Sequence, residues 1–406
     1  MRACLLMLIA TAGGIFYSEL AQSDNFPFGE CRTGYWSSSR NLDDRRDITK
    51  GTCLINWRSE LAEQTQLVLG ARAGINDNAK ADGYSGRLRE GYIETGTDSW
   101  TWRIGRQIIA WGRSDRVNPT DNLSPRDLTL LVPEDEDQRL GINAMLVRHT
   151  LGDNMSVTAV LADFEGNRMP TGTLPRSLIK QGPPDAIETA LKLDHSADSL
   201  DWSISWFDGY ERAPRYQAVI STAPLFVSAY ERKRAIGADF AWAAQAWTLR
   251  GEMAHERLEL DCSSCRTEQR KVSRIVLGAD RNIGESANLN FQVFGVLRDY
   301  QAPSAGEIRR LIDLATDRLN SEFGAREWGV TTRMSDMFFN ERLKLEMSAV
   351  VDFSGSSYVI RPRASYSLTD SVKLMAGLDY FYGDQQSYFG VRKKNSLSFV
   401  ELSLIF

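Results

Sequence analysis

Residues 341–354 read Glu-Arg-Leu-Lys-Leu-Glu-Met-Ser-Ala-Val-Val-Asp-Phe-Ser, and apolar and polar side chains alternate along most of this stretch. Successive side chains of a β-strand point to opposite faces, so this period of two predicts a strand with one apolar and one polar face. The stretch has 14 residues, whereas strands in soluble sheets usually have about 5–6. A tilted strand of about 9–11 residues crosses a bilayer. Period and length together favour a membrane-spanning strand.

The same alternation continues on both sides of this stretch. It recurs clearly at 286–299 and 370–384, and sixteen such segments can be placed along residues 66–406. We therefore predict an all-β fold, a transmembrane antiparallel β-barrel of about 16 strands within a range of about 14–18. Residues 52–62 are a further candidate for the wall. A soluble sandwich is the alternative, but it would need a second apolar sheet against nearly every strand.

Short and long connections alternate between these segments. The short links include 152–154, 196–198, 284–285 and 369–370, and the long ones cover roughly 112–138, 166–184, 210–232, 300–324 and 385–394. Short periplasmic turns and long external loops are typical of outer-membrane barrels. Within one long connection, residues 305–320 have the apolar spacing of a short helix.

The composition excludes several other classes of protein. The chain has 406 residues, 42% of them hydrophobic, a formal net charge of −5 and a mean hydropathy of −0.33. This hydropathy is too low for a multi-span helical membrane protein, and the apolar content is too high for a disordered chain. No excess of Lys and Arg marks a nucleic-acid partner. With 5 Cys and 3 His, we predict no metal site and no cofactor.

The first residues have the pattern of a secretory signal peptide. Arg2 precedes the apolar run 4–10, and Ala21-Gln22-Ser23 offers small residues for cleavage. We expect residues 1–23 to be removed, residues 24–64 to form an N-terminal periplasmic or lumenal segment, and residues 65–406 to form the barrel. Removal of Cys4 leaves four cysteines, an even number that favours disulfides in an exported chain. We expect Cys262–Cys265 to stiffen a loop and Cys31–Cys53 to be the second bridge, on sequence proximity alone.

The C-terminal strand carries a resemblance. Ser398, Val400, Leu402, Leu404 and the terminal Phe406 share one face, and this ending resembles the signature strand that Gram-negative outer-membrane proteins present to their assembly machinery. The resemblance implies a location in the cell outer membrane. The expected partners are outer-membrane lipid and lipopolysaccharide and the assembly machinery through Phe406, with a periplasmic protein as a further candidate. Aromatic residues near strand ends fit interfacial girdles; they are Trp100, Trp102, Trp111, Trp202, Trp206, Trp247, Trp328, Tyr366, Tyr380 and Tyr382.

The most unusual segment is 103–139. Pro119, Pro125 and Pro133 exclude a long helix or a central strand, and a loop of this length is usually functional or disordered. Its alternating Arg and Asp residues suggest an ordered loop that folds into the pore as a constriction, where charges act strongly on solutes. A solvated external loop is the alternative.

This segment also resembles a family. Gly105-Arg106-Gln107, Trp111-Gly112 and Asn118-Pro119-x-Asp121 resemble the pattern of a group of uncharacterised Gram-negative porins, and the first half is similar to alginate-export porins. The resemblance implies a passive pore. It also implies that the 112–138 loop is the constriction, with Arg106, Arg113, Asp115, Arg116, Asp121, Arg126 and Asp127 as the constriction residues. Strict alternation from Trp100 would instead point Arg106 toward lipid, unless a bulge changes its direction.

Inward positions of the predicted strands carry both signs of charge in nearly equal number. We expect a wet lumen without strong ion selectivity. The residues predicted to line the lumen are Arg103, Gln107, Arg250, Arg298, Arg342, Arg361 and Arg363.

The sequence therefore predicts a porin for the passive uptake of small hydrophilic solutes and not an enzyme. Three alternatives stay open. One is an export porin for a polysaccharide or another polymer, although the chain lacks the strong lumenal Arg excess that export of a polyanion such as alginate would need. A barrel that sheaths a periplasmic partner, such as a cytochrome, would need a lumen free of any inward-folded loop. An enzyme would need a nucleophile beside its base, for which His255-Glu256 is the nearest pair.

Overall fold

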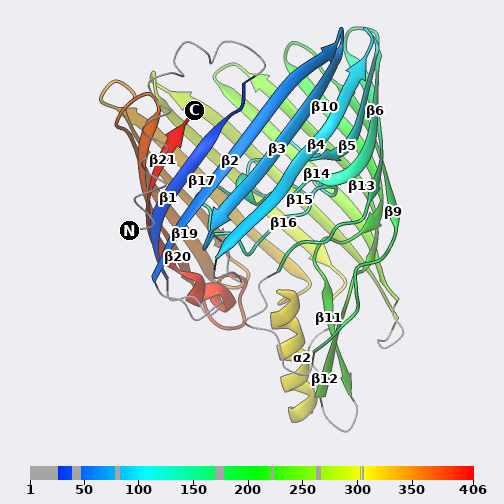
Figure 1. Cartoon of the computed structure of the whole chain (residues 1–406). Helices are drawn as coiled ribbons and strands as arrows, with labels where there is room; N and C mark the ends of the chain where they lie inside the picture. Colours follow the sequence, from blue (N-terminus) through cyan, green and yellow to red (C-terminus); the bar gives the residue numbers. More distant parts are fainter. Residues whose placement is uncertain are drawn as a thin grey trace.

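The computed structural model describes residues 26–38, 47–77, 83–169, 178–220, 224–261, 267–301, 303 and 306–406. They form a closed barrel of 18 strands (Figure 1). The wall strands are β1 (Phe28–Ser38), β2 (Asp47–Ala62), β3 (Thr65–Ile75), β4 (Tyr84–Gly96), β5 (Trp100–Gln107), β6 (Ile142–Leu151), β7 (Met155–Asp163), β9 (Ile187–His195), β10 (Leu200–Tyr210), β13 (Arg232–Ala244), β14 (Trp247–Leu260), β15 (Glu268–Ile283), β16 (Ala287–Arg298), β17 (Arg326–Phe338), β18 (Leu343–Asp352), β19 (Ser357–Ser367), β20 (Val372–Tyr382) and β21 (Leu397–Ile405).

Each wall strand pairs antiparallel with its two neighbours, and the two ends of the sheet meet. β1 pairs with β2 on one side and with β21 on the other. Beyond β21, the backbones of Gly29 and Phe406 exchange two hydrogen bonds of 2.8 and 3.0 Å. The barrel therefore has no free edge, which confirms the predicted fold, with one more hairpin than the expected sixteen strands.

The two ends of the barrel differ in their connections. At one end, called the turn end here, short turns such as 152–154 and 284–286 join the strands; the other is called the loop end. At the loop end, a small sheet of β8 (Leu178–Lys180), β11 (Arg215–Ile220) and β12 (Pro224–Ala229) projects beyond the wall beside α2 (Glu307–Asn320) (Figure 1). α2 confirms the helix expected at 305–320. A 3₁₀ helix, η2 (Gly390–Asn395), lies in the last long connection.

The polarity of the wall is the reverse of that of a soluble protein. On β18, Leu345 and Met347 are 42% and 49% exposed on the outer face, whereas Ser348 and Asp352 are only 2% and 6% exposed on the inner face. Other strands repeat this arrangement, with Met253, Ile275 and Val400 exposed on the outside. The period of two in the sequence thus gives an apolar outer surface and a polar interior.

The prediction that residues 24–64 form a periplasmic or lumenal segment is wrong for the described part. β1 and β2 are full wall strands. Their outer positions carry small or weakly apolar residues such as Thr33 and Gly51. Their inner positions include Trp36 and Ile48, which are 2% and 1% exposed because a loop covers them. The usual contrast between the two faces is therefore weakened, although Tyr35 and Ile55 still face outward with 48% and 40% exposure. Of these two strands, the sequence had marked only residues 52–62 as a candidate for the wall.

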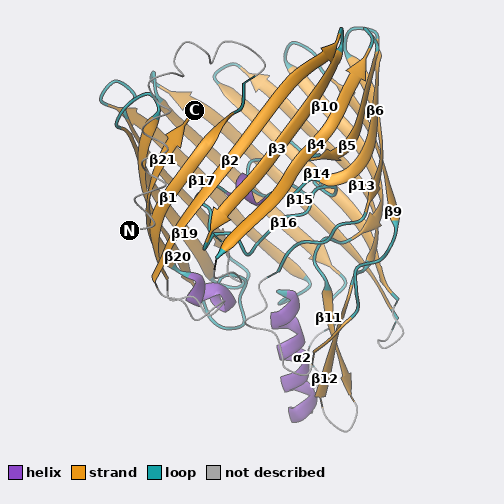
Figure 2. Ribbon diagram, in the orientation of Figure 1, coloured by secondary structure: helices purple, strands orange, loops and turns teal. Residues whose placement is uncertain are grey.

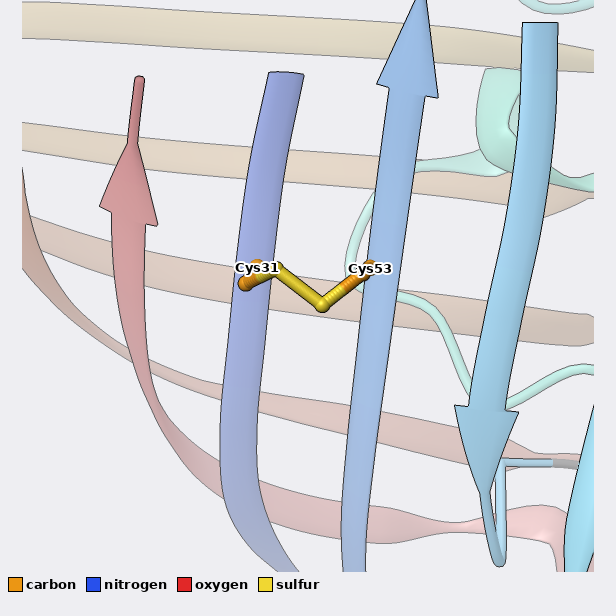
Figure 3. Close-up of a disulfide and its surroundings, with 2 residues drawn as sticks. All are labelled: Cys31 and Cys53. Carbon is orange, nitrogen blue, oxygen red and sulfur yellow. A yellow bond between two sulfur atoms is a disulfide. The ribbon is translucent and has the colours of Figure 1, made fainter. Parts of the chain in front are cut away.

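A disulfide joins these two strands. Cys31 and Cys53 face each other directly across the β1–β2 ladder, on its outer face (Figure 3). This confirms the expected Cys31–Cys53 bridge. The predicted Cys262–Cys265 bridge and the predicted signal peptide, residues 1–23, lie outside the described residues.

We expect the Cys31→Ser, Cys53→Ser double variant to form a barrel that unfolds at a lower temperature. The bridge closes a sequence separation of 22 residues and holds β1, the strand that closes the barrel, in register. Loss of a native disulfide typically costs about 2–4 kcal/mol. The measurement is the temperature at which the heat-modifiable gel mobility is lost. Reductant should lower this temperature more in the wild type than in the variant; equal temperatures for both proteins without reductant would contradict the prediction.

Candidate functional site

Residues 108–141, called the lumen segment here, leave β5 and return to β6 through the interior of the barrel. Their short helix η1 (Asp135–Gln138) lies within the barrel in Figure 2. The segment contacts the wall on three sides, through Leu131 at β1, β2 and β21, through Arg113 at β13 and through Arg116 at β18. Contacts on opposite parts of a closed wall mean that the segment crosses the lumen.

The Gly-Arg-Gln motif makes the exit from β5 possible. Gly105 has φ +129°, and a Cβ there would lie 2.4 Å from the carbonyl oxygen of Gly91, so only glycine fits. Gln107 is fully buried on the inner face, and its amide donates to the carbonyl oxygen of Ala144 at 3.0 Å. Gln107 therefore supports the wall beneath the segment and does not line open lumen.

Arg106 does not line the constriction, contrary to the prediction. It pairs with Asn143 across the β5–β6 ladder, on the outer face, as strict alternation indicated. Its guanidinium forms an ion pair of 2.7 Å with Glu165 of the next loop. The motif arginine thus ties two connections together at the loop end and is not a pore residue.

An apolar cluster fixes the first part of the segment against the wall. Ile109, Trp111 and Leu123 are buried. They pack with the inward apolar side chains of β6, β7, β9, β10 and β13, namely Ile142, Ala144, Leu146, Val160, Ala162, Ala190, Phe207 and Ala235. Trp111 is therefore a core residue, and its prediction as a girdle aromatic is wrong.

Glu252 on β14 is the main polar anchor of the segment. Its carboxylate accepts hydrogen bonds from the backbone N–H groups of Arg113, Ser114 and Thr120 at 3.2, 3.1 and 2.7 Å, and from the Thr120 hydroxyl at 2.9 Å. Glu252 is only 2% exposed. Gly112, with φ +95°, lets the backbone approach, since a Cβ there would lie 2.7 Å from the carboxylate. The Trp-Gly and Asn-Pro-x-Asp motifs thus fold the backbone around a buried carboxylate.

Two predicted constriction residues hold the segment together internally. Asp121 forms an ion pair of 2.6 Å with Arg139, and both side chains are at least 93% buried. Asp127 accepts a hydrogen bond of 3.1 Å from the backbone N–H of Thr129 and a second one from its hydroxyl. Neither carboxylate faces open lumen, so neither is a constriction residue.

Arg113 is also an anchor. Its Nε donates to Asp239 on β13 at 2.7 Å, and its guanidinium lies 3.6 Å from Asp194 on β9. Its backbone carbonyl accepts a hydrogen bond of 3.1 Å from Arg250. The charge of Arg113 is therefore compensated by the wall, contrary to its predicted place at the narrowest point.

The far side of the segment is fixed at the seam between the first and last strands. Leu131 packs on Trp36, Ile48 and Phe399, and its carbonyl oxygen accepts a hydrogen bond of 2.5 Å from the Lys50 ammonium. The same ammonium forms a buried ion pair of 2.6 Å with Glu401. The seam that closes the barrel is thus also a docking site for the segment, with the contact between Trp36 and Phe399, stacked at 4.4 Å, beneath it.

A polar pocket remains between the lumen segment and β17, β18 and β19. Asp115 forms an ion pair of 3.2 Å with Arg333. Arg116 and Arg361 share Asp135, at 3.3 and 2.9 Å. The pocket is lined by Asp115, Arg116, Pro133, Glu134, Asp135, Glu136, Arg333, Glu346, Ser348, Arg361 and Arg363. We call it the eyelet pocket.

The eyelet pocket contains only part of the predicted site. Asp115 and Arg116 line it, together with Arg361 and Arg363, which were predicted on the wall. Arg126 lies beside it, donating to the carbonyl oxygen of Asp135 at 3.0 Å. The predicted set of constriction residues did not include Glu134, Asp135 and Glu136, although their acidic run is visible in the sequence. The set also did not include Arg333 and Glu346. In the sequence, only their inward positions on strands indicate that they line the pocket.

The remaining predicted lumen arginines point inward and are ion-paired. Arg103 pairs with Glu94, Arg250 with Asp280, and Arg298 with Glu327. Arg363 pairs with Asp379. These transverse pairs compensate the wall charges, as the balance of signs in the sequence indicated. Arg342 is an exception: it lies in the turn between β17 and β18, outside the lumen wall.

Two neighbouring carboxyl groups of the pocket have pKa values shifted in opposite directions. Burial, reinforced by the nearby Glu346 carboxylate, raises the pKa of Glu134. Burial also acts to raise the pKa of Asp135, but Arg361 and Arg116 outweigh it and lower that pKa. Between these two pKa values Glu134 is protonated while Asp135 keeps its charge.

Comparison with known proteins shows the fold. The Acinetobacter baumannii proteins OccAB1 and OccAB2 match with TM-scores of 0.61 and 0.59 at 10% and 12% identity, covering 96% and 94% of this chain and 99% and 97% of theirs. The outer membrane protein OpdK from Pseudomonas aeruginosa matches with a TM-score of 0.57 at 11% identity, covering 94% of this chain and 98% of its own. No family model and no curated protein matches the sequence. At these identities the likeness establishes a shared barrel architecture.

We expect Glu252→Ala to loosen the lumen segment. The variant leaves three backbone N–H groups without their acceptor, two of them buried, and each unsatisfied buried group costs about 1–3 kcal/mol. In planar bilayers the variant should give larger and noisier current steps than the wild type, while Glu252→Gln, which keeps one carbonyl acceptor, should have a smaller effect. Glu94→Ala is the matched control, because Glu94 is an inward carboxylate that pairs with Arg103 of the wall. Unchanged steps in Glu252→Ala would show that Glu252 does not hold the segment.

Proposed function

We propose that this protein is a channel in the outer membrane of a Gram-negative bacterium, through which small hydrophilic solutes diffuse passively into the periplasm. One observation carries the proposal: within a closed barrel with an apolar outer face, the lumen segment leaves a charged pocket against β17–β19. The lumen segment is the constriction of this channel. The eyelet pocket is the place where its side chains meet the solute.

The outer surface supports a membrane location. Large apolar side chains are exposed on most wall strands, far more than a water-soluble surface tolerates. Aromatic residues form two belts, with Trp100 and Trp247 near the turn end and Trp328 and Tyr382 near the loop end. OpdK, one of the similar structures, is named as an outer membrane protein. Among the described residues, no helix is long and apolar enough to span a membrane.

The interior supports diffusion past a charged filter. Barrels of 16–18 strands leave an aqueous channel, and here the lumen segment narrows it. Arg333 and Asp135 are partly exposed, with 37% and 46% of their side chains accessible. Cationic and anionic groups face each other across the eyelet pocket, which favours small polar or charged solutes over apolar ones.

The alternatives find less support. A sheath around a periplasmic protein needs an open bore, whereas the lumen segment crosses this one. Enzyme chemistry at His255-Glu256 is not favoured, because His255 lies on the outer face and Glu256 on the inner face. His255 does contact Ser273 at 2.9 Å, but no acidic side chain among the described residues orients its imidazole as a hydrolase would need. We also propose that the assembly machinery inserts the barrel into the membrane by recognising the strand that ends at Phe406.

Conductance across a planar bilayer with a salt gradient tests the proposed function. The refolded wild type should give steady steps, and Arg333→Gln should shift the reversal potential toward cations because it removes one positive charge from the eyelet pocket. Arg103→Gln is the matched control, an inward arginine outside the pocket with a comparable exposure of 28%. A folded barrel that carries no current would overturn the channel. Equal shifts of the reversal potential in both variants would show that the eyelet pocket does not determine the selectivity.

We expect selectivity to change as the pH falls from neutral toward the ordinary pKa of a glutamate side chain. Because the pKa of Glu134 is raised and that of Asp135 is lowered, Glu134 loses its charge first as the pH falls. The eyelet pocket then becomes more positive, and the reversal potential should move toward anions. Glu134→Gln should remove this pH dependence and resemble the wild type at low pH. The same pH dependence in this variant would show that another group titrates.

A further inference from the structure

The outer face near the loop end carries a row of positive charges on three adjacent strands. Arg234 on β13 is the direct cross-strand partner of Arg257 on β14, and Arg257 is the direct partner of Lys271 on β15. All three side chains are exposed. We call these residues the basic row.

Like charges in direct cross-strand contact destabilise a sheet, so the basic row needs counter-charges. Asp208 on β10 supplies one, at 3.5 Å from Arg234 and 2.8 Å from Arg232. Lys271 approaches Asp299 only through its backbone N–H, at 2.9 Å. Within the described part of the chain, the side chains of Arg257 and Lys271 have no ion-pair partner. On the same face, Glu259 accepts a hydrogen bond of 3.1 Å from Gln269 and forms no ion pair with the basic row among the described residues. Within this part of the chain, the charges of Arg257 and Lys271 can therefore bind an external anion.

The depth of the basic row identifies the region in which that anion lies. On β15, Lys271 and Arg281 are both exposed on the outer face, 10 residues apart. Ten residues extend about 33 Å along a strand, or about 25 Å along the axis at a tilt of about 40°, which is the height of the apolar band of such barrels. Only uncharged residues lie between them on this face, namely Ser273, Ile275, Leu277 and Ala279. The basic row thus marks the border of the hydrocarbon at the loop end.

We propose that the basic row binds the phosphate groups of lipopolysaccharide in the outer leaflet. This inference rests on the proposed membrane location, in which the loop end faces outward. A guanidinium binds phosphate through two parallel hydrogen bonds, and the lysine adds a point charge. The acyl chains of the same lipid then lie along Ile236, Met253 and Ile275, which are 63%, 55% and 48% exposed below the row. Between the charges and these apolar residues, the His255–Ser273 pair offers polar groups at the level of the sugars.

The test measures lipopolysaccharide bound to the purified, folded barrel in detergent. The triple variant Arg234→Gln, Arg257→Gln, Lys271→Gln should bind purified lipopolysaccharide about 10-fold or more weakly than the wild type, since each surface cation contributes separately to anionic lipid binding. Arg281→Gln is the matched control at the turn end of the same strand and should bind as the wild type does. Dephosphorylated lipopolysaccharide should bind the wild type as weakly as the intact lipid binds the triple variant.

Equal binding by the wild type and the triple variant would overturn the proposal, and so would an equal loss in Arg281→Gln. Displacement of the lipid by millimolar inorganic phosphate would show a general anion site and would also overturn it. Folding of each variant is checked by heat-modifiable gel mobility. Conductance of the same samples separates the two proposals: a conducting barrel without selective lipid binding refutes only the basic row, whereas a silent wild type refutes the channel.

Discussion

The whole structure depends on one constraint, that a strand facing hydrocarbon has no water to satisfy its backbone. Every N–H and C=O of the wall must pair within the protein, and only a closed sheet achieves this. Closure here occurs between β1 and β21, extended by the bonds between Gly29 and Phe406. The seam carries the docking site of Leu131 on its inner side, and the adjoining β1–β2 ladder carries the disulfide on its outer side. Closure of the wall and placement of the lumen segment are therefore physically linked.

Inside this wall, the lumen segment is positioned by buried charge and apolar packing together. Glu252 accepts hydrogen bonds from three backbone N–H groups at one end of the segment, and Lys50 donates one to a backbone carbonyl at the other end. The run that contains Asp135 is held by Arg361 of the wall and by Arg116 of the segment itself. A segment held on three sides has few alternative positions. The eyelet pocket thus has a defined shape although a loop forms one side of it.

The motifs that resemble those of other porins serve to fold the lumen segment more than to select solutes. Gly105 and Gly112 allow close backbone approach, Asp121 closes a buried ion pair, and Arg106 binds a neighbouring connection. Distinctive residues in a motif are often assigned to the chemistry of a site, but here they fold the loop. The pocket charges come instead from an acidic run and from inward strand positions that look ordinary in the sequence.

By itself, the sequence determined the barrel, the side of most strands that faces outward, the alternation of short and long connections, and the existence of a special segment at 103–139. These features follow from local periodicity and composition, which each stretch carries on its own. Only the tertiary structure decided that β1 and β2 belong to the wall, and that Arg113 is an anchor while Arg333 lines the pocket. The reason is that packing of the lumen segment reverses the polarity of the inner positions it covers. Ion pairs such as Arg113–Asp239 and Arg361–Asp135 also join residues more than a hundred positions apart, and no local pattern specifies them.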